Sequence, residues 1–159
     1  VDAKRYWPDA VTYLLDDSLP FFEKGVVPEA LAQQEATSWD LQPLVEDICG
    51  DDHCDDDLSQ VHAAIARRFP ADRMALLSSQ QDNVISQFDE LNATQFQSAL
   101  AALADDVLTP NRWRVFTHAG SSHTMLVDLS NHTTSAGETV KTFVTQMIDD
   151  APDWASAGP

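Results

Sequence analysis

The sequence predicts an α/β fold with a mostly parallel sheet flanked by helices. Three short apolar runs rich in β-forming residues do not alternate between apolar and polar positions, which is typical of strands buried on both faces of a parallel sheet. These runs are residues 11–15, 74–78 and 113–117. Helical patterns separate them, and strands that alternate with helices favour an open parallel sheet with crossover connections.

Three segments have the apolar spacing of amphipathic helices. Residues 58–69 follow an acidic run at 55–57, which suits a helix N-terminus, and are stopped by Pro70. Residues 94–108 and 137–148 repeat the apolar pattern. We therefore expect one helix in each segment.

The domain organisation follows from length and strand count. The 159 residues suffice for one domain with a core, but three strands are few, because sheets usually have about four to six. The first predicted strand comes early, and the chain begins with Val1 rather than Met. We expect residues 1–159 to be a single domain, the C-terminal half of a larger fold, present as a processed product or a fragment. A small independent α/β domain is the other interpretation, and residues 19–57 are expected to form a cap or an excursion over the sheet edge.

The charge is strongly acidic, with nine Lys and Arg against 26 Asp and Glu and a formal net charge of −17. Such a surface repels phosphate backbones, so we expect no nucleic-acid partner. The acidity fits a salt-rich habitat, where screening weakens self-repulsion, or simple solubility. No apolar run reaches the roughly 18 residues of a membrane span, and none is predicted.

Two cysteines, Cys49 and Cys54, bracket a short acidic loop. A disulfide between them implies an oxidising compartment and hence a secreted or periplasmic protein. The alternative is a metal site formed with His53. Because that set lacks the paired spacing of structural zinc sites, we favour the disulfide and expect no metal and no cofactor.

Asp82 and His123 are the candidate catalytic residues. Ligands of parallel α/β sheets bind outside the carboxyl ends of the strands, and each of these residues lies in the loop after a predicted strand. A serine hydrolase needs a histidine base and a carboxylate that orients it. The order Ser, Asp, His along the chain is that of the α/β-hydrolase fold. Gly120 is expected to allow the tight turn that aims the ring.

Other interpretations stay open for these residues. Asp82 alone is also typical of a helix cap or a loop salt bridge, and His118 is a rival base in the same loop. Asp16 and Asp17 follow the first predicted strand and are the alternative catalytic acids.

The nucleophile is not identified in this chain. A nucleophile elbow reads G-x-S-x-G between a strand and a helix, and the sequence has no such string. Ser121 and Ser122 share the loop of His123 and cannot easily reach the far nitrogen of its ring. We expect the nucleophilic serine and the oxyanion donors in an N-terminal half, on a separate chain or in a preceding segment.

Residues 11–22, 75–82 and 116–126 resemble the C-terminal half of the pectinacetylesterase and Notum-like carboxylesterase family. They match, in order, a strand ending in an acidic turn with aromatic residues, the acid-bearing loop and the histidine loop. The resemblance implies an α/β hydrolase that is secreted and cleaves acetyl or acyl esters on carbohydrate or protein, with Asp82 and His123 in its triad.

A second function class is a non-catalytic acidic binding or interaction domain of α/β type. Its acidic cluster at 51–57 would bind a divalent cation or a basic partner, although the cluster does not match the calcium loop of EF-hands. A flavodoxin-like domain is weaker still, because the chain has no glycine-rich phosphate loop.

Overall fold

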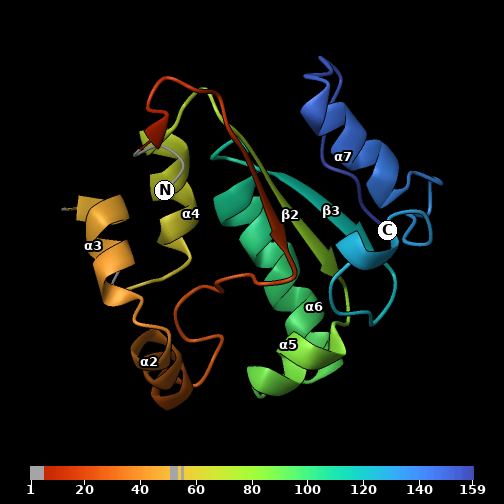
Figure 1. Ribbon diagram of the computed structural model, residues 1–159. Coiled ribbons are helices and arrows are strands. Elements are labelled where there is room, and N and C mark those ends of the chain that lie inside the picture. Colours follow the sequence, from red (N-terminus) through yellow and green to blue (C-terminus); the bar gives the residue numbers. More distant parts are fainter. Residues whose placement is uncertain (1–5, 51–53, 55) are drawn as a thin grey trace.

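The computed structural model describes residues 6–50, 54 and 56–159, and a three-stranded parallel sheet stands at its centre (Figure 1). The strands are β1 (Tyr13–Asp17), β2 (Arg73–Ser79) and β3 (Arg114–His118), hydrogen-bonded in the order β1-β2-β3. Both pairings are parallel. The α/β class predicted from the sequence is confirmed.

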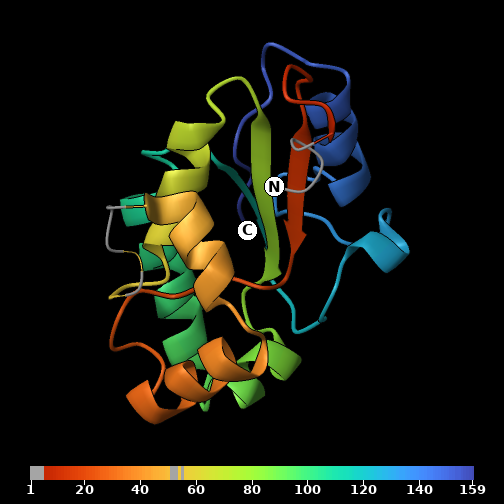
Figure 2. The same ribbon diagram turned by 60° about the vertical axis from the view of Figure 1, so that its left-hand side comes forward.

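Helices cover both faces of the sheet (Figure 2). The helices of the described chain are α2 (Glu29–Ser38), α3 (Gln42–Cys49), α4 (Gln60–Arg68), α5 (Asn83–Phe88), α6 (Ala93–Ala102), the π-helix η2 (Leu103–Leu108), the 3-10 helix η3 (Leu126–Asp128) and α7 (Val140–Ile148). The predicted helix at 94–108 is thus α6 and η2 in succession. Those at 58–69 and 137–148 are present with later starts.

The central strand β2 separates two hydrophobic clusters because successive side chains of a strand point to opposite faces. Met74 and Leu76 belong to the cluster with α4, α6 and η2, whereas Ala75 and Leu77 belong to the cluster with α7. All four are at most 1% exposed. The expectation of burial on both faces is therefore correct for β2.

The edge strand β1 differs from β2. Tyr13 is 41% and Leu14 is 39% exposed, and among the described residues β1 pairs only with β2. The expectation that this strand is buried on both faces is wrong. The strand also lies further along the chain than residues 11–15, so Asp16 and Asp17 close β1 instead of following it.

Helix α4 begins differently from the prediction. Its N-cap is Ser59, whose side chain makes no capping bond, and Asp57 instead accepts hydrogen bonds from the Ser59 N–H (3.1 Å) and Oγ (2.8 Å). Asp55 lies outside the described residues. The acidic run therefore orders the turn before the helix.

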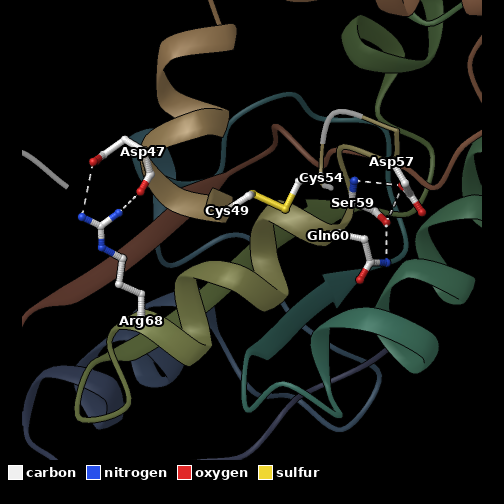
Figure 3. The surroundings of a disulfide bond; sticks show 7 residues. All are labelled: Asp47, Cys49, Cys54, Asp57, Ser59, Gln60 and Arg68. Atoms are coloured by element: carbon white, nitrogen blue, oxygen red, sulfur yellow. Dashed lines mark hydrogen bonds and ion pairs between the residues drawn. A yellow bond between two sulfur atoms is a disulfide. The ribbon is translucent and has the colours of Figure 1, made fainter. Parts of the chain in front are cut away.

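Residues 19–57 contain the two helices α2 and α3. Helix α2 has no buried residue, so its sequence has no apolar period. Helix α3 packs on α4, and a disulfide joins Cys49 at the end of α3 to Cys54. Arg68 at the end of α4 forms an ion pair with Asp47 of α3 (Figure 3). The predicted disulfide is confirmed. The thiolate metal site is wrong because both sulfurs are in the bond; His53, like Asp51 and Asp52, lies outside the described residues. In the part of the chain that the structure describes, no helix has the length and apolar character to cross a membrane.

Candidate acid–histidine site

Asp82 follows β2 and caps helix α5. Its Oδ1 accepts hydrogen bonds from the backbone N–H of Val84 (2.9 Å) and of Ile85 (3.0 Å). Such a side chain satisfies donors that a helix N-terminus leaves without partners. The residue is 0% exposed. Capping therefore fixes the carboxylate and leaves Oδ2 for another donor.

His123 supplies that donor. Its Nδ1 lies 3.0 Å from Asp82 Oδ2, and its side chain is 33% exposed. A carboxylate only accepts hydrogen bonds, so Nδ1 is the donor of this pair, and in a neutral imidazole Nε2 is then the nitrogen that carries the lone pair. Among the described residues no group hydrogen-bonds to Nε2. Asp82 is therefore both a helix cap and the partner of the histidine, because each of its two carboxylate oxygens accepts different hydrogen bonds.

The loops after β2 and β3 continue the pairing of their strands. Three backbone hydrogen bonds join them: Gln80 N–H to His118 C=O (3.0 Å), Gln81 N–H to Gly120 C=O (2.9 Å) and Asn83 N–H to Ser121 C=O (3.2 Å). These bonds flank Asp82 and run up to the loop residue two before His123. The pairing of two adjacent parallel strands is what brings the acid and the histidine together.

The end of β1 holds the other side of the histidine loop. The Asp17 carboxylate accepts hydrogen bonds from the N–H of Met125 (2.8 and 3.0 Å) and of Leu126 (3.0 Å). Ser18 Oγ accepts one from the N–H of Thr124 (3.3 Å). Ser18 and Thr124 have φ of 75° and 56°, a region that non-glycine residues rarely adopt. The hydrogen bonds between the end of β1 and the loop hold Ser18 and Thr124 in this strained conformation, and Thr124 directly follows His123.

Neither alternative acid contacts the His123 ring. Asp17 binds backbone N–H groups, as described above, and Asp16 Oδ1 accepts a hydrogen bond from the N–H of Leu19 (3.1 Å). Burial raises the pKa of Asp16 to about 7, although the Leu19 bond opposes this shift. Of the three candidate acids, Asp82 alone bonds to the imidazole.

His118 lies in a separate, buried network. Its Nε2 is 2.9 Å from Ser79 Oγ, and that hydroxyl donates to the Ser122 carbonyl (2.6 Å). A serine hydroxyl has one hydrogen, so His118 must donate from Nε2 and cannot act as a base toward Ser79. Burial and the neighbouring His132, whose ring centroid is 4.8 Å away, lower the pKa of His118. His118 is a structural residue at the end of β3, and not a base in the loop of His123.

Gly120 has a different role from the one predicted. Its φ is not in the left-handed region, and a Cβ at this position would lie 2.4 Å from Cε1 of His118. The glycine is required by space, because the His118 ring packs directly on its backbone. This arrangement sets the path of the loop toward His123.

Sequence reasoning missed the Ser79–His118 contact and the buried carboxyl of Asp89, which is 5% exposed at the end of α5. Both depend on neighbours far along the chain. Burial, Glu35 and Asp82 raise the pKa of Asp89 to about 7. A single Asp at the end of a helix has no sequence signal that separates it from a solvated one.

Comparisons of the chain with known protein families, with curated proteins and with solved structures yield no match. The fold and the site define its class by themselves. The described residues form an α/β protein in which a buried aspartate pairs with a partly exposed histidine at the carboxyl edge of a parallel sheet.

Proposed function

We propose that this chain is the part of a serine hydrolase of the α/β-hydrolase type that supplies the triad acid Asp82 and the base His123. The observation that carries the proposal is the 3.0 Å contact between Asp82 Oδ2 and His123 Nδ1. The carboxylate is fully buried and the imidazole partly exposed. This pairing leaves the far nitrogen of the ring available to a nucleophile.

The chemistry is acyl transfer through a covalent intermediate. His123 Nε2 takes the proton of a serine hydroxyl as its oxygen attacks the ester carbonyl, and the Asp82 carboxylate stabilises the imidazolium that forms. The imidazolium then returns this proton to the departing alcohol. In the second half, His123 activates a water that cleaves the acyl-enzyme and releases the acid.

The proposal places the nucleophile and the oxyanion donors in an N-terminal half of the same enzyme, as a separate chain or a preceding segment. The outer edge of β1 supports this placement, because Tyr13 and Leu14 are exposed there and no strand of the described residues pairs with that edge. Exposed apolar edge strands are normally covered or paired. A parallel strand added beside β1 would end next to Asp17, at the same carboxyl edge of the sheet as His123.

The substrate class and location rest on other observations. The resemblance to pectinacetylesterases and Notum-like carboxylesterases supports a carboxylic ester hydrolase acting on acetyl or acyl esters of small molecules or polymers. The Cys49–Cys54 disulfide supports a secreted or periplasmic enzyme.

Fluorophosphonate labelling of the purified protein, followed by denaturing separation and intact-mass measurement, tests the proposal. We expect label on a serine of a second polypeptide or of a preceding segment, and loss of that label in the His123→Ala variant. Label on a serine of residues 1–159 contradicts the placement of the nucleophile. No label and no second polypeptide would contradict the hydrolase and favour the non-catalytic binding domain.

A further inference from the structure

A cavity of about 440 Å³, whose lining includes neither Asp82 nor His123, lies between the loop after β1 and helices α2 and α3. Its apolar lining includes Phe21, Phe22, Leu41 and Val45. This volume falls within the range of small-molecule sites, roughly 300–1,000 Å³.

The charged lining of this cavity is almost entirely acidic. The carboxyl side chains are Glu23, Glu29, Glu35, Asp56, Asp57 and Asp89. Lys24 is the single basic side chain among its described lining residues. A concave surface of one charge sign with low-dielectric walls concentrates ions of the opposite sign.

Asp89 is the innermost of these acids. It is 5% exposed, and among the described residues the influences on its carboxyl are burial and the charges of Glu35 and Asp82, with no hydrogen bond that would stabilise the carboxylate. Oε1 of Glu35 is also buried without a hydrogen-bond partner. Buried polar groups are normally paired, so these two carboxyls have acceptor capacity that the described contacts leave unused.

One ring contact joins the ends of the two helices that carry these acids. Trp39, one helical turn after Glu35, stacks on Phe88, which directly precedes Asp89; the ring centroids are 5.8 Å apart and the planes 5° from parallel. Two like-charged groups thus line one cavity, and burial, followed by the charges of Glu35 and Asp82, raises the pKa of Asp89 to about 7.

We propose that this cavity binds an organic cation, a protonated amine carried on an apolar body, through Glu35 and Asp89. The ammonium would donate hydrogen bonds to both carboxylates, and the apolar body would contact the phenylalanines. Ionic hydrogen bonds of this kind are the strong ones.

A metal ion fits the cavity less well than an amine. A calcium ion requires six to eight oxygen ligands, and among the described residues no three metal-ligating side chains converge. The apolar walls and the volume are also unsuited to a bare ion. The proposal is independent of ester hydrolysis and holds for either function class.

Titration of the 159-residue chain with phenethylammonium at pH 8, followed by NMR or calorimetry, tests the site. The neutral 2-phenylethanol is the matched ligand control, because it has the same ring and reach without the charge. We expect the amine to bind at least about tenfold more tightly than the alcohol. Equal affinity of the two ligands would overturn the proposal.

The residues are tested with isosteric variants. Asp89→Asn and Glu35→Gln should each weaken amine binding about tenfold, whereas Asp149→Asn, an exposed acid at the end of α7, should not change it. Wild-type affinity in both cavity variants would contradict the site. If Asp89→Asn does not fold, the less buried Glu35→Gln decides the question.

Calcium chloride separates the two kinds of cation. We expect calcium to give no binding heat that depends on Glu35 or Asp89. Heat that the two substitutions abolish would show that the cavity binds a metal ion and not an amine. Because binding is measured without turnover, a negative result leaves the labelling experiment unaffected, and the reverse also holds.

Discussion

Two buried aspartates stand at opposite ends of the six-residue helix α5, Asp82 at the N-cap and Asp89 at the C-cap. Asp82 is 0% and Asp89 is 5% exposed. Three donors surround the Asp82 carboxylate, namely two backbone N–H groups and the His123 ring. No donor among the described residues reaches the Asp89 carboxyl. Similar burial therefore comes with opposite hydrogen-bond environments.

The difference follows from the direction of the helix. N–H groups without partners point out of a helix N-terminus and favour a carboxylate, whereas carbonyl groups point out of the C-terminus and repel one. Near Asp89 lies Glu35, a further acid, whereas the partner of Asp82 is an imidazole. Nearby hydrogen-bond donors, rather than depth of burial, decide whether a buried carboxylate is stabilised by the protein or left to accept hydrogen bonds from a ligand.

The largest expected effect separates the proposed catalytic role of Asp82 from its capping role. In the proposed hydrolase, with its N-terminal half present, Asp82→Asn should lower kcat for a chromogenic acetate ester by about 10⁴-fold, because the amide no longer fixes the correct tautomer of His123. The fold should remain, since Asn also caps helices. His123→Ala should have a comparable effect, and Asp149→Asn should leave the rate unchanged. A mild Asp82→Asn together with a severe Asp16→Asn or Asp17→Asn would show that the acid is misassigned.

Removing the carboxyl entirely probes the donors around Asp82. Asp82→Ala leaves the Val84 and Ile85 N–H groups and the His123 Nδ1 without their acceptor. We expect a loss of about 2–3 kcal/mol in the free energy of unfolding, measured by urea denaturation. Asp82→Asn should lose clearly less, because its Oδ1 still accepts from the helix. Equal losses in the two variants would mean that capping contributes little.

Gly120 tests how the loop presents His123 to Asp82. In Gly120→Ala the new Cβ displaces the His118 ring, which sits at 2.4 Å, and we expect a destabilisation of about 1–2 kcal/mol in urea. Gly158→Ala is the matched control, because its Cβ meets an atom no closer than 3.9 Å. A Gly120→Ala variant as stable as Gly158→Ala would show that the ring moves freely.

The smallest effect concerns Asp89 and has the opposite sign. Its raised folded pKa of about 7 means that the folded state keeps a proton that the unfolded state releases near pH 4, so this group lowers stability as pH rises from about 4 to 7. Asp89→Asn should therefore raise the melting temperature at pH 8 by roughly 2–4 °C, corresponding to about 1 kcal/mol. At pH 3.5 the variant and the wild type should melt alike. A variant less stable at pH 8 would contradict the absence of donors at Asp89.

The sequence predicted the site to the extent that local patterns carry it. The residues after two strands, Asp82 and His123, were found because the carboxyl ends of parallel strands gather at one edge. The local role of Asp82 as a cap was visible as well. Its simultaneous bond to the imidazole depends on the register of β2 against β3, which sequence spacing does not reveal.

Other features could not be predicted from local patterns. Helix α2 buries no residue, so no period marks it. The prediction of a doubly buried first strand failed because apolar composition does not tell an edge strand from a central one. The reason for a glycine at position 120 could not be predicted either, because the space there is limited by the His118 ring.

The sequence by itself determined the α/β class, a cysteine spacing that favours a disulfide, and a small set of candidates that contains Asp82 and His123, because strand patterns, cysteine positions and strand ends are local features of the chain. Tertiary structure decided which oxygen of Asp82 meets which nitrogen, why His118 is not the base, and where Glu35 and Asp89 come together. The physical reason is that hydrogen-bond donors and like charges act over a few ångströms, between groups that are tens of residues apart along the chain.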